Sequence, residues 1–401
     1  MKNLEHIQAE SHYLAGHYHP LPVVIKQGKA EWLYDIEGNQ YLDMMSAYSA
    51  VSHGHCHPEL VKTLRKQAKK LCVTSRACYT ENLLPLAKKL TELAGLPKVL
   101  FMNSGAEAVE TAIKAARKWG YEKKGITSGH AEIIVAQGNF HGRTSGIISC
   151  SSEPLYRKHF EPLMPGFKII PYGDALALRN AINKNTCAFL VEPIQGEAGI
   201  IVPPEGYLKA IRQICTDQNV LLMADEVQTG LCRTGKWFAF QHEAIQVDGL
   251  ILGKALGGGM LPISAFLAQE EVMSVFTPGT HGSTMGGNPL AAAVAYKALA
   301  ILESENLAQQ ACEKGAYLLK GLQKIHSPLI KGLRGKGLLI GIEIDTQLHS
   351  ARAICEKLLA NGLLTKETHD TVIRLAPPLV IKYKNIDFAL QILARTLKEL
   401  L

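Results

Sequence analysis

Two apolar runs that end in opposite charges restrict the fold of this chain more than any other feature of it. Val220–Ala224 stops at Asp225, and Leu250–Leu252 stops one glycine before Lys254. Each run has the length and apolar richness of a strand buried on both faces, which does not ordinarily end in a lone acid or a lone amine. Because ligands of open α/β sheets lie outside the carboxyl ends of the strands, both charges fall where a ligand would bind.

Short apolar segments alternate with helical ones on both sides of these runs. The expected strands are Val99–Met102, Glu132–Ala136, Gly146–Cys150, Lys168–Ile170, Cys187–Val191, Val220–Ala224, Gly249–Leu252 and Ser264–Leu267. This alternation predicts an α/β fold with a mainly parallel sheet covered by helices. We expect it to form a large domain over residues 46–298.

Beyond residue 305 the regular alternation of strands and helices ends, and the pattern becomes typical of an α+β domain. Strands are expected at Leu338–Ile344 and Val372–Leu375, with a final helix that reaches Leu401. A hairpin pattern lies between Val23 and Leu42. We therefore expect residues 1–45 and 299–401 to form a second, smaller domain.

An acid and an amine at two strand ends point to one cofactor above all, pyridoxal phosphate. That cofactor needs a lysine for its Schiff base and a carboxylate that keeps its ring nitrogen protonated. Lys254, partly desolvated at a sheet edge, would have a lowered pKa and a nucleophilic amine. Two plainer roles remain open: Asp225 could cap a helix over the residues that follow, and Lys254 could extend from its strand end into solvent.

Two further strand ends carry residues suited to such a cofactor. Ser104-Gly105-Ala106 separates a strand from the helix expected over 108–119, and a helix N-terminus after a glycine turn offers free N–H groups to a phosphate. Phe140 could stack on a planar ring, and Arg143 could make a two-pronged contact with a carboxylate. The alternatives are a plain strand–turn–helix junction, core packing for Phe140 and a surface role for Arg143.

Composition excludes several other classes of function. The 401 residues carry a formal net charge of +7, without a long basic tract or interleaved aromatics, so we expect no nucleic-acid partner. The basic run Lys62–Lys70 is typical of the solvated face of a helix. Gly249–Ala268 is long enough to span a bilayer, but it contains Lys254 and Pro262, so we expect no membrane partner.

Nine cysteines without metal-type spacing are typical of reduced thiols, and we expect a cytoplasmic protein. His53-Gly54-His55-Cys56-His57 is rich in metal-binding side chains. Its single-residue spacing, in a turn before Pro58, does not match tetrahedral zinc sites, so we expect no metal there.

Seven blocks resemble the class III (subgroup II) pyridoxal-phosphate aminotransferases of fold type I, over essentially the whole chain. The blocks are YLDMMSAYSAVSHGHCHP, FMNSGAEAVETAIKAARKW, GNFHGRT, VEPIQGEAGI, ADEVQTGLCRTG, LGKALGGG and HGSTMGGNPLA. Within the class, YHPLP, SAYSAV, TSRACY and LLTKETHDTVIRLAPPLVI resemble the branch that acts on ornithine. The resemblance implies a seven-stranded, mainly parallel sheet and a ping-pong transfer from L-ornithine to 2-oxoglutarate, giving L-glutamate 5-semialdehyde and L-glutamate.

The resemblance also assigns cofactor contacts residue by residue. Lys254 would be the Schiff-base lysine and Asp225 the partner of the ring nitrogen, both catalytic. The other cofactor contacts implied are Gln228 on the ring hydroxyl, Phe140 and Val227 on the ring faces, and Ser104, Gly105 and Ala106 on the phosphate. Thr284 would reach the phosphate from a second subunit, which implies a homodimer.

For the substrates, the resemblance implies that Tyr18 and Arg143 hold the carboxylate-bearing end of ornithine. Arg374 would bind the α-carboxylate of glutamate or 2-oxoglutarate, Glu197 would pair with Arg374 when ornithine occupies the site, and Tyr48 would line the pocket.

One residue departs from the pattern of part of the family. Some members have an aromatic residue where this chain has His141, and histidine is also found in acetylornithine aminotransferases. The alternatives left open are an acetylornithine or 4-aminobutyrate aminotransferase, an aminomutase on the same scaffold, and a non-catalytic amine sensor that keeps the cofactor.

Overall fold

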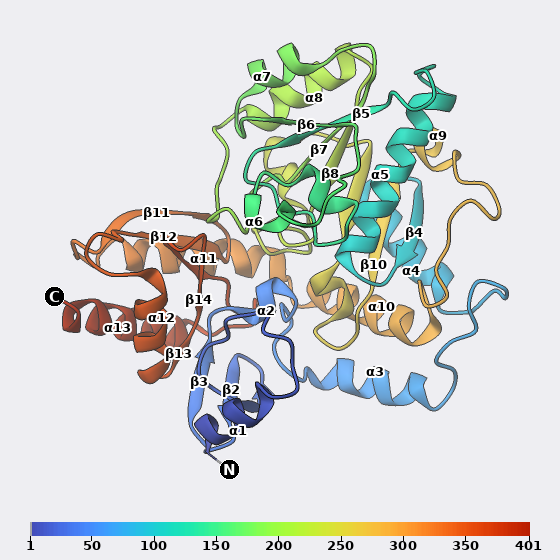
Figure 1. Cartoon of the computed structure of the whole chain (residues 1–401). Coiled ribbons are helices and arrows are strands. Elements are labelled where there is room, and N and C mark those ends of the chain that lie inside the picture. Colours follow the sequence, from blue (N-terminus) through green and yellow to red (C-terminus); the bar gives the residue numbers. More distant parts are fainter. Residues whose placement is uncertain (1) are drawn as a thin grey trace.

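A seven-stranded sheet forms the core of the larger part of the molecule in the computed structural model, which describes residues 2–401 (Figure 1). Only β10 runs antiparallel to its neighbours, β4 and β9, and the remaining pairs are parallel, which confirms the predicted sheet. In order across the sheet the strands are β4 (Lys98–Met102), β10 (Ser264–Ala268), β9 (Gly249–Leu252), β8 (Leu221–Asp225), β7 (Thr186–Val191), β5 (Glu132–Ala136) and β6 (Phe167–Ile170).

Helices cover both faces of this sheet because its strands are apolar on both sides. In β8, Leu221 and Met223 pack in the cluster that includes α5 (Gly105–Glu122), whereas Leu222 and Ala224 pack in the cluster on the opposite face. This period-2 division is the reason that the central strands read as continuous apolar runs. The other face is covered by α7 (Ala175–Ala181) and α8 (Tyr207–Asp217).

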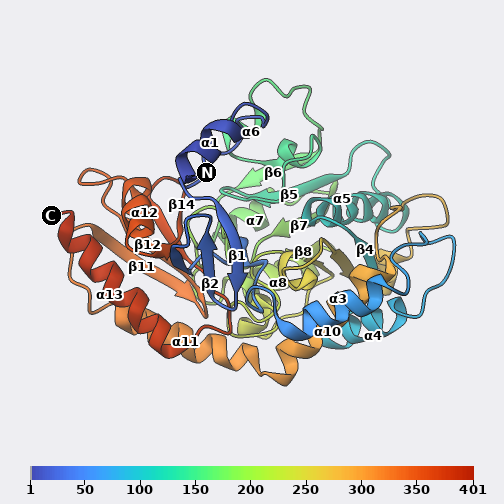
Figure 2. The ribbon, with the colours of Figure 1, turned by 90° about the horizontal axis from the view of Figure 1, so that it is seen from below.

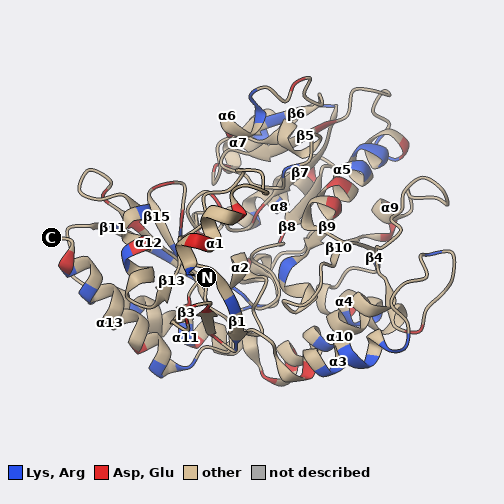
Figure 3. Cartoon of the chain, turned by 60° about the horizontal axis from the view of Figure 1, so that its bottom comes forward, with Lys and Arg blue, Asp and Glu red and all other residues tan. Residues whose placement is uncertain are grey.

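Three helices pack together below the sheet in Figure 1: α3 (Pro58–Ala68), α4 (Leu83–Ala94) and α10 (Pro289–Ser304). Leu60 of α3 is buried whereas Lys62 and Lys66 are exposed, so the basic run is a solvated helix face, as predicted (Figure 3). None of the helices within residues 2–401 combines the length and the apolar character needed to cross a membrane.

Two four-stranded sheets lie beside the large one (Figure 2). The first contains β1 (Ile25–Lys29), β2 (Trp32–Asp35), β3 (Gln40–Asp43) and β13 (Leu363–Leu364). Because β13 pairs with β3, this sheet joins the two ends of the chain. The second contains β11 (Ile330–Lys336), β12 (Leu339–Ile344), β15 (Val372–Leu375) and β14 (Lys366–Thr368).

Longer helices pack against these two sheets, and short ones link the remaining segments. The longer helices are α11 (Leu307–Leu322), α12 (Ala351–Ala360) and α13 (Tyr383–Glu399). The short helices are α1 (Asn3–Glu10), α2 (Ser46–Ser49), α6 (Pro154–Arg157) and α9 (Glu270–Met273), with 3-10 turns η1 (Ile147–Cys150), η2 (Ala239–Glu243) and η3 (Lys254–Gly257).

One predicted strand is wrong. Gly146–Cys150 was expected to be extended, but Ile147–Cys150 forms the 3-10 turn η1. Thr144 starts this turn, since its Oγ1 accepts a hydrogen bond from the N–H of Ile147 (3.2 Å) and its carbonyl from that of Ile148 (3.0 Å). All four η1 residues are buried, which explains why their apolar run resembles a strand.

A strained turn and a buried arginine connect the large sheet to its neighbours. All four residues of α2 have positive φ, between 42° and 75°, a left-handed conformation that costs about 1–2 kcal/mol per non-glycine residue. The fully buried Arg233 donates to Ser46 Oγ (3.2 Å) and Ser52 Oγ (3.0 Å) around this turn. It also donates to the carbonyls of Leu338 (2.9 Å) and Pro377 (2.6 Å). The turn carries Tyr48.

The three histidines of the 53–57 segment have separate partners. His53 Nε2 lies 3.0 Å from the carbonyl of Ala298, and His55 Nε2 lies 2.7 Å from Asp43 Oδ2. His57 Nε2 lies 3.3 Å from Glu305 Oε1, so the three rings serve contacts between different segments.

Candidate active site

Asp225 and Lys254 line one cavity of about 210 Å³ at the carboxyl edge of the large sheet. β8 ends at Asp225, and β9 ends two residues before Lys254, so parallel pairing of the two strands brings the charges to the same edge. The cavity is lined by Gly105, Ala106, Phe140, His141, Gly142, Glu192, Asp225, Val227, Gln228, Thr229 and Lys254.

Asp225 is held in place by two hydrogen bonds. His141 Nδ1 donates to its Oδ2 at 2.7 Å, and the N–H of Val227 donates to its Oδ1 at 3.1 Å. The alternative role as a helix cap is wrong, because turns follow Asp225 and the next helical segment is η2. Burial opposes a charge on His141, but the hydrogen bond to Asp225 and the negative charges of Asp225 and Glu192 outweigh it and raise the pKa of His141.

Lys254 begins η3 in a left-handed conformation, with φ of 42°. It is partly buried and lines the cavity, so it does not extend freely into solvent from the strand end. Burial lowers the pKa of its amine, opposed by the charge of Glu197 and reinforced by that of Arg374. The predicted lowered pKa therefore has the predicted cause.

The N-terminus of α5 also lines the cavity. Ser104 is its N-cap: its Oγ accepts from the N–H of Glu107 (3.2 Å), and the Glu107 carboxylate accepts from the N–H of Ser104 (2.7 Å). Within residues 2–401, the N–H groups of Gly105 and Ala106 have no hydrogen-bond partner, and both residues line the cavity. A Cβ at Gly105 would lie 2.9 Å from Val227 Cγ1, so glycine permits this close approach.

These groups fit pyridoxal phosphate. A fixed carboxylate suits a protonated ring nitrogen, an amine of lowered pKa suits reaction with a carbonyl, and two free N–H groups at the positive end of an 18-residue helix suit a phosphate. Phe140 and Val227 supply apolar walls between these ends.

A second cluster lies beside the cavity. Arg374 is 1% exposed, and its Nη1 donates to Glu197 Oε1 at 2.5 Å. Gln228 Nε2 donates to the same oxygen at 2.9 Å, and the Arg374 guanidinium lies 4.6 Å from the centre of the Tyr48 ring. Burial would raise the pKa of Glu197, but the charges of Arg374 and Lys254 and the hydrogen bond from Gln228 hold it below its usual value.

Three predicted site residues lie at the surface. Arg143 is exposed, with its guanidinium 3.6 Å from the centre of the Tyr156 ring and 5.5 Å from that of Phe140. Tyr18 is 72% exposed and lies in the segment after α1. Thr284 is exposed on a loop held to the start of α5, where Asn103 Nδ2 donates to Ser283 Oγ (3.0 Å).

Sequence reasoning missed two of the buried groups. His141 was noted only as a departure from a pattern, although it contacts Asp225. Glu192 follows β7, and the rule applied to Asp225 would have found it at the same sheet edge. Its carboxylate accepts from the N–H groups of Phe140 (2.9 Å) and Gly196 (3.3 Å), and burial raises its pKa to about 7.

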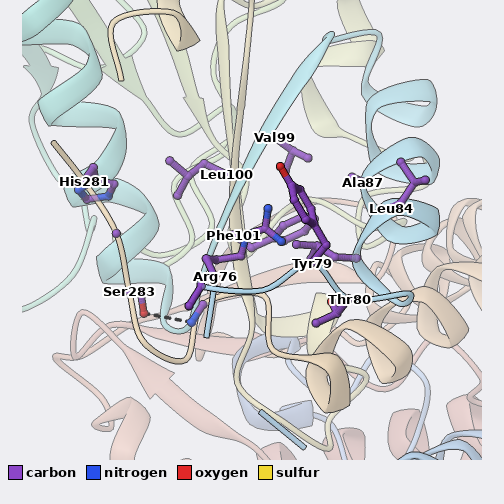
Figure 4. A pocket seen from close by; sticks show the side chains of 14 residues that line it. Arg76, Tyr79, Thr80, Leu84, Ala87, Val99, Leu100, Phe101, His281 and Ser283 are labelled. Atoms are coloured by element: carbon purple, nitrogen blue, oxygen red, sulfur yellow. Dashed lines mark hydrogen bonds between the residues drawn. The ribbon is translucent and has the colours of Figure 1, made fainter. Parts of the chain in front are cut away.

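A larger cavity of about 550 Å³ lies away from this chemistry (Figure 4). It is formed by residues 76–87, β4 and the loop 281–286, where the N–H of Gly286 donates to Ser283 Oγ (3.0 Å). Its lining contains neither an acidic residue nor a lysine, so we place the reactive centre in the smaller cavity.

The fold and the site match known aminotransferases. The family model "Aminotransferase class-III" matches residues 13–397, and the chain belongs to this family. The chain is similar to the ornithine aminotransferase of Bacillus subtilis, with 53% identity over 99% of this chain and 98% of that protein.

Solved structures show the same likeness. An ornithine aminotransferase from Toxoplasma gondii has a TM-score of 0.98 and 42% identity, covering 100% of this chain and 96% of that one. An acetylornithine aminotransferase from Elizabethkingia anophelis has a TM-score of 0.90 and 46% identity, covering 100% of both chains.

Proposed function

We propose that this chain is an ornithine aminotransferase, which transfers the δ-amino group of L-ornithine to 2-oxoglutarate in a ping-pong cycle and gives L-glutamate 5-semialdehyde and L-glutamate. The observation that carries the proposal is the ion pair between Glu197 and Arg374 beside Lys254. In this pair Glu197 occupies the guanidinium that an α-carboxylate would need, so the site suits a donor with no carboxylate at its reacting end. The full-length likeness to curated ornithine aminotransferases supports this substrate.

Pyridoxal phosphate, when bound, supplies a carbonyl carbon for the amino group and a ring that accepts the electron pair released at the substrate carbon. Asp225 would hold the proton on the ring nitrogen, and His141 keeps this carboxylate oriented. Gly105 and Ala106 would hold the phosphate with their N–H groups, beside the Ser104 cap. Phe140 and Val227 would contact the two faces of the ring, and Gln228 its hydroxyl.

Lys254 would carry the proton transfer. Its Nζ, whose pKa is lowered by burial, would take a proton from the δ-carbon of ornithine and pass it to the former carbonyl carbon of the cofactor, and in the second half-reaction it would make the reverse transfer to the α-carbon of the keto acid. Arg143 and Tyr18 would bind the carboxylate-bearing end of ornithine, so that the distal amine points inward.

The Glu197–Arg374 pair would distinguish the two substrates. Ornithine presents an unsubstituted CH₂-amine at the reacting end, and the closed pair leaves no free cation there. Glutamate presents an α-carboxylate at that end, which would displace Glu197 and bind Arg374 in a two-pronged contact beside Tyr48. Such an exchange lets one site accept two differently charged groups.

The test is to mix the yellow holoenzyme with L-ornithine, N-acetylornithine or 4-aminobutyrate and to follow the loss of cofactor absorbance in a single turnover. We expect ornithine to react fastest. Fast reaction with N-acetylornithine but not with ornithine would instead establish an acetylornithine aminotransferase.

A homodimer with shared sites is part of the proposal. Thr284 is exposed on a loop that is held at two points, by Asn103 and by Thr111, whose Oγ1 lies 2.8 Å from His281 Nε2. Exposed apolar side chains lie near this loop, among them Leu84, which is 75% exposed, and Met285, which is 47% exposed. Such a patch is typical of a protein interface, and a second copy would place Thr284 at the partner's phosphate.

Subunit complementation tests the shared site. Lys254→Ala and Thr284→Ala would each weaken activity as homodimers. A heterodimer of the two variants would carry both defects in one site and neither in the other, so mixing after dissociation should restore activity. If the mixture shows only the average of the two variants, Thr284 acts within its own subunit.

The domain division and the location are also proposals. The large sheet lies within residues 98–268, and the pairing of β3 with β13 supports grouping residues 1–45 with 299–401, leaving 46–298 as the large domain. All nine cysteines are free, which supports a reducing, cytoplasmic location. Limited proteolysis would test the division: we expect resistant fragments that end near residues 45 and 298.

A further inference from the structure

We propose that Tyr156 is a positioning residue that makes the site selective for an amine donor with a distant carboxylate, because its ring holds the guanidinium of Arg143. The inference rests on the proposed role of Arg143 in binding ornithine. Its basis is the shortest cation–ring distance among residues 2–401: the guanidinium carbon lies 3.6 Å from the centre of the Tyr156 ring.

The contact orients Arg143 without consuming its hydrogen-bond donors. A guanidinium stacked on a ring uses its flat face, while its N–H groups point outward in the plane. Within the described chain, no hydrogen bond or ion pair links the Arg143 side chain to another residue, and the residue is exposed. Arg143 therefore keeps a full set of donors free while its guanidinium rests against the Tyr156 ring, as a two-pronged carboxylate receptor requires.

Tyr156 also links this receptor to the cavity. Its ring packs edge-on against Phe140, with 6.1 Å between the ring centres, and Phe140 lines the cavity that contains Lys254. The backbone of Phe140 is fixed by its hydrogen bond to Glu192 (2.9 Å). One tyrosine thus sets the position of Arg143 relative to the wall against which the ring of the cofactor would pack.

The segment that carries Tyr156 is itself anchored. α6 begins after Glu153, whose Oε1 accepts from the N–H of Leu155 (3.2 Å), and Arg157 Nη1 donates to the carbonyl of Ser151 (3.3 Å). Since both neighbours of Tyr156 in the chain are held, its ring acts as a fixed support. The aromatic face, and not the hydroxyl, is the part that contacts Arg143.

The chemistry of the donor makes this support specific. Ornithine differs from 1,4-diaminobutane only by the carboxylate at the end opposite the reacting amine. A receptor placed by Tyr156 should therefore affect ornithine and leave 1,4-diaminobutane unaffected. Glutamate also has a carboxylate at the end opposite its reacting amine, so its half-reaction should weaken in the same direction as that of ornithine.

The test compares Tyr156→Leu, Tyr156→Phe and Arg143→Gln in the holoenzyme. Steady-state kinetics with ornithine and 2-oxoglutarate give KM and kcat, and single turnovers compare ornithine, 1,4-diaminobutane and glutamate. For Tyr156→Leu we expect the KM for ornithine to rise about fivefold, the range expected for one cation–ring contact, with little change in kcat. Tyr156→Phe should retain the normal KM because it keeps the ring. Tyr317→Leu, at a partly exposed tyrosine on α11, is the matched control.

Three results would overturn the proposal, in distinguishable ways. If Arg143→Gln raises the KM for ornithine but Tyr156→Leu does not, the tyrosine does not position the arginine. If Tyr156→Leu slows all three substrates equally, its role is general packing. If Arg143→Gln leaves ornithine unaffected, the proposed role of Arg143 fails, and this inference falls with it. In the double variant, Tyr156→Leu should add nothing to the loss caused by Arg143→Gln.

Discussion

His141 Nδ1 lies 2.7 Å from Asp225 Oδ2, and neither side chain is more than 5% exposed. A buried charge is stable only when it is paired, so each of these groups depends on the other. Glu192 lies next to them, buried as well, and the charge of His141 partly offsets the burial that raises its pKa. The electrostatics of the cavity therefore belong to the three residues together.

Glu192 should make the stability of the protein fall as pH rises. Its pKa is raised from 4.5 to about 7, so proton binding favours the folded state; this stabilisation is complete below pH 4.5 and is lost as pH rises towards 7. At 1.4 kcal/mol per pKa unit, the effect is about 3 kcal/mol.

Glu192→Gln imitates the protonated acid. We expect the difference in the free energy of unfolding between the wild type and this variant to decline from pH 5 to pH 8, as measured by urea denaturation. Glu92→Gln, at an exposed position on α4, serves as the control. A difference that stays constant with pH would contradict the assignment.

Glu197→Gln should impair the ornithine half-reaction more than the glutamate half-reaction. The variant removes the charge that pairs with Arg374, leaving the guanidinium uncovered at the reacting end. We expect a loss of about tenfold with ornithine, equivalent to about 1.4 kcal/mol, and a smaller loss with glutamate. Single-turnover absorbance measurements of each half-reaction give the ratio, and equal losses would refute the proposed exchange.

Lys254 should react with electrophiles at lower pH than an exposed lysine. Its pKa is lowered by burial, and the charge of Glu197 opposes this shift. In cofactor-free protein, pulse acetylation followed by mass spectrometry should label Lys254 at lower pH than Lys88, which is exposed on α4. Glu197→Gln should move the labelling midpoint of Lys254 lower still. An unchanged midpoint in this variant would show that the Glu197 charge does not reach the amine.

Gly196→Ala should disturb Gln228 without unfolding the protein. A Cβ at position 196 would lie 2.3 Å from Gln228 Oε1, and the end of this side chain can move away. The movement would break the hydrogen bond from Gln228 to Glu197 (2.9 Å). We expect Gly196→Ala to slow the ornithine half-reaction by about tenfold. In a protein that already carries Gln228→Ala, adding Gly196→Ala should cause little further loss.

Gly332→Ala provides the comparison, since a Cβ there meets only Glu343 at ordinary contact distances. Loss of thermal stability in Gly196→Ala, well beyond that of Gly332→Ala, would indicate that the backbone gives way before Gln228 does.

The central strands could be predicted because a strand that is buried on both faces has apolar residues at nearly every position, which appears in the sequence as a continuous apolar run. β7, β8, β9 and β10 are buried at every residue, and each was found within a residue or two. β11 was missed because it is only partly buried and contains glycines at 332 and 335. η1 was misread because four buried residues in a tight turn have the same apolar character as a strand.

The position of the reactive centre could be predicted for the same reason. A charge after a buried strand is rare, and parallel pairing brings Asp225 and Lys254 to one edge. The side chains that contact these two groups could not be predicted from the sequence. His141 and Asp225, for example, are 84 residues apart, and their contact depends on how side chains pack. The approach of Glu197 to Arg374, 177 residues away, followed only from resemblance, and nothing in the sequence indicates the contact of Tyr156 with Arg143.

Arg233 ties the wall around Arg374 to distant parts of the chain. Its four hydrogen bonds reach the left-handed turn that carries Tyr48, as well as the carbonyls of Leu338 and Pro377. During folding, this turn can be held only after residues far beyond the large sheet have arrived. A partly folded protein with a complete sheet would therefore have Asp225 and Lys254 at its edge but no properly formed wall around Arg374. During folding, the protein would therefore become able to bind the cofactor before it became able to bind the substrate.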